Sequence, residues 1–207
     1  MTRWRARPII GASALSAALC LAGCGAETAS DGDAPALDEA QVIARAQPIA
    51  AEFQATLQAQ LKAALEAGGP QQAVAVCHEA ASAIAAMQSE QSGALARRIA
   101  DRNRNPDNAV PDELRAAYDT LARQPVIDAK PASTLAQTGE GSEARVHYLS
   151  AIPMREQPCS TCHGRAIAPA PKAQIDKLYP EDAATGFAPG DLRGALVITW
   201  PIAAFEE

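Results

Sequence analysis

Apolar residues recur at helical spacing through the first third of the chain. The stripe that begins around Asp38 predicts a helix up to Ala67, and Gly68-Gly69-Pro70 predicts its end. Pro48 falls inside this helix and is expected to kink or split it. A second helix is predicted from Gln71 to about Gln88, because Pro70 favours a helix start and the apolar spacing resumes. The stripe of the first helix consists of Leu37, Val42, Ile43, Ile49, Phe53, Leu57, Leu61 and Leu65.

The middle of the chain is less periodic. Residues 94–100 fit a strand or a helix end, and residues 102–108 have the composition of a turn. Pro111-Asp112-Glu113 predicts the start of a third helix that reaches about Arg123. Residues 124–141 are polar and contain two prolines, so loops are expected there.

The C-terminal part alternates in the way that strands do. Strands are predicted at 144–152 and 192–202, separated by a rigid spacer at 169–171 and a short helical turn at 174–178. In the last strand, one face would carry Ala195, Val197 and Thr199, and the other Leu196, Ile198 and Trp200. Helices first and strands late predict an α+β fold with an antiparallel sheet.

The N-terminus has the features of a bacterial lipoprotein signal. In residues 1–23, a front with three arginines precedes the uncharged apolar run 9–21, which is shorter than the roughly 20 residues that span a membrane. The small residues before Cys24 resemble a lipobox, which predicts that Cys24 carries a diacylglycerol. An ordinary signal peptide with an incidental cysteine is the alternative. Residues 24–36 are then a flexible tether, and residues 37–207 form the folded domain.

The lipoprotein signal predicts the location of the protein. A lipid-anchored chain would face the periplasm from a bacterial membrane. Gly25 lacks the acidic residue that often retains lipoproteins at the inner membrane, so the outer membrane is the expected location.

Composition narrows the class of protein. The chain has 207 residues, of which 48% are hydrophobic and only 4% aromatic, with a formal net charge of −6. The apolar fraction argues against unbroken disorder, and the acidic balance argues against nucleic acid as a partner. A core this poor in aromatic residues would be thin, and a bound cofactor would help to fill it.

One motif specifies a cofactor. Cys159, Cys162 and His163 form C-x-x-C-H, the attachment pattern of c-type haem. Two thiols at this spacing add to the two haem vinyl groups, and the adjacent imidazole reaches the iron from one face. A thioredoxin-type disulfide would not need the histidine, and a zinc site would need a second cysteine pair. A single motif predicts one covalent haem c.

Five cysteines are present, and the predictions above leave one of them without a role. Cys77 would be an odd thiol in an oxidising compartment, where it could be buried, form an intermolecular disulfide, or ligate the iron opposite His163. His78, His147, Met87 and Met154 are other candidates for that position, although Met87 is more typical of plain core packing. The residues alone leave the choice open between Cys77 and the histidines.

Four arginines form the basic cluster of the predicted domain. Two hypotheses fit them: their forked guanidinium groups pair with the haem propionates, or they lie in a solvated turn with local salt bridges to Asp101 and Asp107. The cluster consists of Arg97, Arg98, Arg102 and Arg104.

Several stretches in order make the chain resemble a known family. They are GGPQQAVAVCHEAA at 68–81, RRIADRNRNPDNAVPDELRAAYDTL at 97–121, CSTCHG at 159–164 and YPEDAATGFAPGDLRGALVITWP at 179–201. The family is that of exported PAS-like c-type haem proteins, a domain of unknown function first described structurally in cyanobacteria. The resemblance implies a PAS-like fold with long N-terminal helices. It also implies His163 on one face of the haem and the thiolate of Cys77 on the other, which favours Cys77 over His147.

Three hypotheses for function follow. The first is a periplasm-facing haem lipoprotein that senses redox state through a His/Cys-ligated iron and signals to a partner protein. The second is a low-potential electron-transfer protein, and the third is a haem enzyme such as a peroxidase. Six-coordinate iron argues against the third, and the sequence contains no catalytic triad, phosphate-binding loop or carboxylate cluster for a metal, so we do not expect an enzyme.

Overall fold

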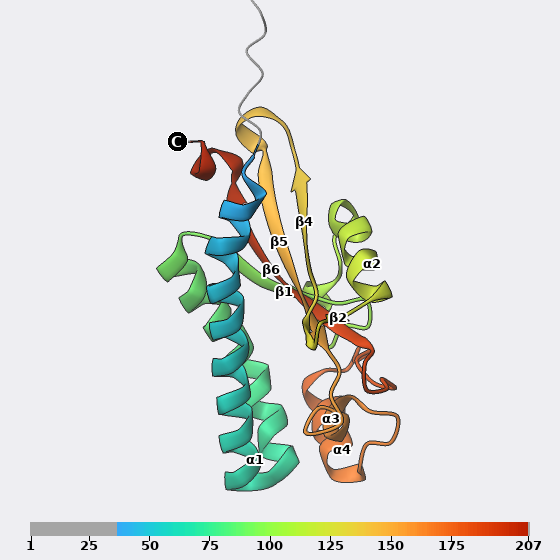
Figure 1. The fold of residues 1–207 in the computed structure, drawn as a ribbon. Coiled ribbons are helices and arrows are strands. Elements are labelled where there is room, and N and C mark those ends of the chain that lie inside the picture. The colour runs from blue at the N-terminus through green and yellow to red at the C-terminus, as the bar shows by residue number, and fades with distance from the viewer. Residues whose placement is uncertain (1–36, 207) are drawn as a thin grey trace, which may run out of the picture. The chain divides into compact units, whose positions relative to one another are not determined.

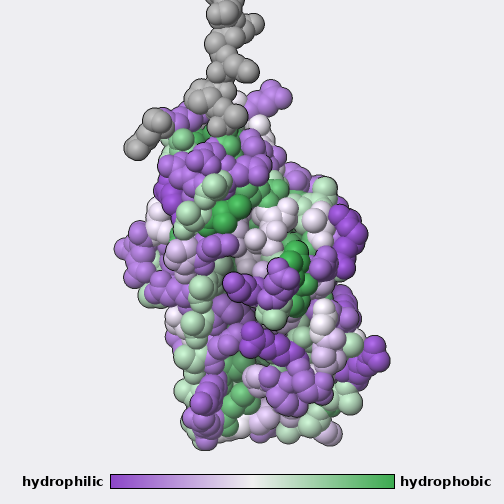
Figure 2. Space-filling view, viewed as in Figure 1, coloured by the Kyte–Doolittle hydropathy of each residue, from purple (hydrophilic) through white to green (hydrophobic). Residues whose placement is uncertain are grey.

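The computed structural model of the protein describes residues 37–206 (Figure 1). The predicted signal at 1–23, lipid attachment at Cys24 and tether at 24–36 lie outside these residues and stay predictions. Within the described part, no helix combines the length and the apolar character needed to cross a membrane. On the face seen in Figure 2, hydrophilic residues cover most of the surface, with apolar patches between them.

Helix α1, Glu39–Ser92, is a hairpin of two limbs. The Asp38 side chain caps its start by accepting hydrogen bonds from two backbone N–H groups. The helix is interrupted at Gly68 and Gly69, and Gly69 has φ 70° and ψ −167°, a region that only glycine adopts readily. The chain reverses there, so the limbs lie side by side (Figure 1). Two helices around a glycine turn are confirmed, although the helix continues through Pro48 without a break and reaches beyond Gln88.

A four-stranded antiparallel sheet forms the second layer. Its order is β1-β6-β5-β4. The strands are β1 (Leu95–Ile99), β4 (Ser133–Thr138), β5 (Arg145–Pro153) and β6 (Leu192–Pro201). A separate two-stranded hairpin pairs β2 (Val126–Ile127) with β3 (Lys130–Pro131). The sequence therefore predicted the α+β class and the antiparallel sheet correctly.

Short helices complete the fold. The α-helices are α2 (Arg115–Arg123), α3 (Ser160–His163) and α4 (Pro169–Leu178). The 3₁₀ helices are η1 (Pro106–Asn108), η2 (Asp112–Leu114), η3 (Gly141–Glu143) and η4 (Ile202–Phe205).

Each face of the sheet has its own core. On one face, Leu196, Ile198 and Trp200 of β6 pack with buried residues of both α1 limbs. On the other, Ala195 and Val197 pack with Leu114, Tyr118 and Leu121, at and before α2. The predicted alternation of β6 is thus confirmed for these residues, and it places the sheet between α1 and α2.

Two segments differ from their prediction. Residues 124–141 contain the edge strand β4, which the sequence did not predict because half-exposed edge positions tolerate polar residues. Residues 169–171 are not a spacer: Pro169 and Pro171 occupy the first turn of α4, where proline needs no intrahelical N–H partner.

Candidate functional site

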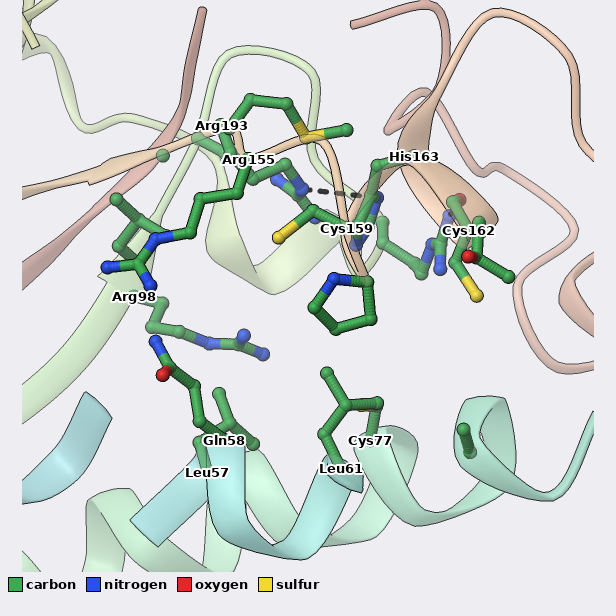
Figure 3. Close-up of a pocket in the computed structure, with 18 of the residues that line it drawn as sticks. Leu57, Gln58, Leu61, Cys77, Arg98, Arg155, Cys159, Cys162, His163 and Arg193 are labelled. Atoms are coloured by element: carbon green, nitrogen blue, oxygen red, sulfur yellow. Dashed lines mark hydrogen bonds between the residues drawn. The ribbon is translucent and has the colours of Figure 1, made fainter. Parts of the chain in front are cut away.

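A cavity of about 640 Å³ opens between the α1 hairpin, strand β1 and the segment around α3. This volume falls within the range of about 300–1,000 Å³ that is usual for cofactor and ligand sites. Cys159, Cys162 and His163 line it, and Cys77 faces them from the second limb of α1 (Figure 3). All three cysteines are free thiols and half-buried. The fold therefore brings the motif and the remaining cysteine together.

The motif is held by contacts from distant parts of the chain. Arg104 donates from Nη2 to the main-chain oxygen of Cys162 at 2.7 Å. The same guanidinium forms a two-pronged salt bridge with Asp182, at 3.0 Å and 3.2 Å. These two side chains are only 11% and 4% exposed. The main-chain oxygen of His163 also accepts from the N–H of Phe187 at 3.0 Å. Arg104 and Asp182 thus fix the position of α3.

The ring of His163 is oriented by its Nδ1 atom. Nδ1 lies 2.7 Å from the main-chain oxygen of Ala184 and 3.2 Å from Nε of Arg193. A carbonyl oxygen can only accept, so the shorter contact requires a proton on Nδ1 and leaves a lone pair on Nε2. Burial holds the pKa of His163 well below its usual value, and the charges of Arg193 and Arg104 act in the same direction. The ring is therefore a neutral imidazole with Nε2 free to ligate.

The wall of the cavity formed by α1 is apolar around the thiol of Cys77. Leu57, Leu61 and Leu65 of the first limb and Val74 of the second line the cavity beside Cys77. Burial raises the pKa of the Cys77 thiol, and the positive charges of Arg98 and Arg104 oppose this rise. Burial likewise raises the pKa of Cys162. A cation or metal at the centre of the cavity would favour the thiolate form of Cys77.

The basic cluster divides between the cavity and the surface. Arg98 and Arg104 line the cavity, but Arg97 and Arg102 do not. The hypothesis of salt bridges to Asp101 and Asp107 is wrong in its partners, because the turn folds back on distant segments. The ion pairs are Arg102 with Asp191, Arg104 with Asp182 and Arg115 with Asp101, and Arg97 reaches only the main-chain oxygen of Asp107.

The other candidate ligands lie elsewhere or on the wrong wall. His147 is buried in the sheet, where its ring nitrogens lie 2.7 Å and 2.8 Å from the hydroxyls of Thr138 and Thr199, and it does not line the cavity. His78 is exposed and meets Tyr179 edge-on. Met154 lines the cavity but packs with Cys159, on the side of His163. Of the candidates opposite His163, the geometry favours Cys77.

Three residues of the site were not predicted. Arg193 lines the cavity next to His163, Ala184 orients the imidazole, and Asp182 anchors Arg104. An arginine at the start of an apolar strand, as Arg193 is, was the one signal that could have been used. Burial lowers the pKa of Arg193 to about 9, and the nearby charges of Arg98 and Arg104 add to this effect.

The fold and site define an α+β protein in which a helical hairpin and a C-x-x-C-H segment enclose one cavity. The chain belongs to the Tll0287-like family, whose model matches residues 33–201. Its fold is similar to that of the cyanobacterial heme-protein Tll0287, with a TM-score of 0.54 and 23% sequence identity. That likeness covers 78% of this chain and 93% of the solved one. No curated protein matches the sequence.

Proposed function

We propose that the protein is a monohaem c-type cytochrome with a PAS-like fold. Thioether bonds from Cys159 and Cys162 would hold one haem, with His163 and Cys77 as its two axial ligands. The observation that carries this proposal is that the motif and Cys77 line one cavity from facing walls (Figure 3). The fold likeness to a heme-protein and the family membership support it.

The residues present fit such a group. Nε2 of His163 has a free lone pair because Nδ1–H donates to Ala184. The attachment thiols are free, and leucines of the first α1 limb supply apolar surface for a porphyrin ring. Arginines in the same cavity offer partners for carboxylates.

The chain's own residues would set the properties of the site. A bound haem supplies one-electron chemistry at its iron. The Ala184 oxygen holds the His163 ring in place and increases its basicity. A Cys77 thiolate would donate negative charge to the iron of a bound haem, which would favour the ferric state and lower the reduction potential relative to a His/Met pair. A neutral thiol is a poor ligand, so reduction or protonation would weaken the bond to Cys77.

This weak ligand suggests a biological role. We propose that a change of coordination at Cys77 reports redox state to a partner protein, from a lipoprotein on the periplasmic side of the membrane. Cys77 lies on the helix limb that leads directly into β1, so displacement of the thiol has a route to the sheet.

Low-potential electron transfer is the second candidate function. Cys159 and Cys162 are half-buried, so a haem edge attached to them would lie near the surface, where a redox partner can dock. Enzyme chemistry of the peroxidase type is less well supported, since side chains are available for both axial positions.

Spectroscopy of the purified full chain tests the proposal. The host must carry the haem-attachment machinery, and spectra are taken oxidised, reduced, and reduced under carbon monoxide. Haem that stays with the polypeptide after acid-acetone extraction is expected, and Cys159→Ala with Cys162→Ala should abolish this retention. A shift under carbon monoxide would favour the sensor, and an unchanged reduced spectrum would favour electron transfer. A parent chain without covalent haem would overturn the proposal.

A further inference from the structure

Two arginines enter the cavity without an anionic partner. Arg98 lies on β1, opposite Leu196 of β6, on the sheet face that α1 covers. Arg193 lies at the start of β6, and both arginines are half-buried (Figure 3). Within residues 37–206, neither forms a salt bridge. A guanidinium that is partly removed from water without a counter-charge is unfavourable, so an anion in the cavity would stabilise both arginines.

The other cations at the site do not share this property. Arg104 is already bonded to Asp182 and to the Cys162 carbonyl. Arg155 also lines the cavity, but it is exposed, so water solvates its charge. Arg97 and Arg102 lie outside. Of the arginines described at this site, Arg98 and Arg193 are therefore the two that lack both an anionic partner and full contact with water.

The contacts of Arg193 also point to a missing acceptor. Its Nε lies 3.2 Å from Nδ1 of His163, but Nδ1 must carry a proton to donate to Ala184. Two N–H groups cannot bond to each other, so this contact does not satisfy Arg193. Its remaining bond, from Nη1 to the Arg102 carbonyl, is long at 3.4 Å. The guanidinium therefore keeps donors for a group in the cavity.

We infer that Arg98 and Arg193 each bind one carboxylate of the bound haem inside the cavity. The inference rests on the proposed function. Haem carries two propionate groups, and the arginine fork matches a carboxylate with two parallel hydrogen bonds. Arg98 and Arg193 come from neighbouring strands, so the sheet holds the spacing of the pair. Arg104 is instead a positioning residue for α3.

Resonance Raman spectroscopy of the haem-loaded full chain tests this assignment. The propionate bending bands respond to hydrogen bonds at the carboxylates. Arg98→Gln and Arg193→Gln should each shift one band and lower the reduction potential, because a positive charge near the haem is lost. Arg97→Gln is the matched control, since it removes the same charge from the same strand outside the cavity.

The outcomes separate this inference from the proposed function. A parent chain without covalent haem overturns the proposed function. If the parent chain carries haem but both glutamine variants show the same propionate bands as the parent, the arginine assignment alone is overturned. Arg193→Lys provides a second variant that keeps the charge: a shifted band with a retained potential supports the fork contact, and an unshifted band counts against it.

Discussion

Cys77 and His163 face each other across one cavity, although the sequence separates them widely. Cys77 lies on the second limb of α1 and His163 on α3 (Figure 3). The glycine turn of α1 brings the first residue to this cavity, and Arg104 with Asp182 holds the second. The proposed haem would lie between these two side chains, with one on each side of its iron.

Cys77→Ala should remove the low-spin thiolate signal from the electron paramagnetic resonance spectrum of the oxidised protein. The haem should remain attached, because Cys159 and Cys162 are untouched. His147→Gln is the control and should keep the signal, since His147 does not line the cavity. An unchanged spectrum in the Cys77 variant would exclude this thiol from the iron.

Arg104→Ala should destabilise the fold strongly. It leaves the carboxylate of Asp182, 4% exposed, without its partner, and such losses cost about 3–5 kcal/mol. Arg115→Ala breaks an ion pair whose side chains are 42% and 53% exposed, and should cost less than about 1 kcal/mol. Chemical unfolding at equal haem content measures both values. Similar losses for the two variants would contradict the structural role of Arg104.

Substitutions at two glycines should differ in their effect. Gly69→Asn should lower the free energy of unfolding by about 1–3 kcal/mol, because φ 70° with ψ −167° is a glycine region. Gly93 has φ 67° and ψ 8°, a left-handed conformation that asparagine tolerates. Gly93→Asn should therefore lower the free energy of unfolding by less than Gly69→Asn does. Equal costs in thermal unfolding would mean that the α1 turn does not require glycine.

His147 should make the fold sensitive to acid. Burial lowers its pKa, Glu113 opposes this effect, and Arg145 and Arg97 reinforce it. His147 is then protonated near pH 6.5 in the unfolded chain but stays neutral at this pH in the folded chain. The free energy of unfolding is therefore highest above this pH and decreases as the pH falls below it.

The measurement is the free energy of unfolding at pH 8 and at pH 5. His147→Gln should show a smaller loss between these values than the parent chain. His78→Gln changes an exposed histidine and should lose as much stability as the parent. An equal loss in the His147 variant would show that other groups cause the acid sensitivity.

The sequence predicted those features that short-range pattern encodes. The alternation of β6 assigned Leu196 and Val197 to opposite faces correctly, because successive side chains of any strand point to opposite faces of the sheet. The motif and Cys77 were identified by spacing and by resemblance. By contrast, β4 lies half-exposed at the edge of the sheet, where polar residues are tolerated, so its sequence lacks the alternation that marks a strand.

Short-range sequence patterns could not identify the residues that support the site. Arg193 meets His163 from a separate strand, and Asp182 reaches Arg104 across the fold. Arg193 stands out in the sequence only as a charge at the start of an apolar strand, and nothing local marks its contact with His163 or the contact of Asp182 with Arg104. The division of the arginine cluster was unpredictable for a similar reason, since strand pleating directs Arg97 and Arg98 to opposite faces.

The two walls of the cavity also have a mechanical consequence. Cys77 belongs to the N-terminal hairpin, and Cys159 and Cys162 to the C-terminal part of the chain. A haem bound at both walls would act as a cross-link that closes a loop of roughly eighty residues, which restricts the unfolded chain much as a disulfide does. Loss of the bond to Cys77 would open this loop while the haem stays attached. The oxidation state of one metal would then set how firmly the hairpin is fastened to the rest of the protein.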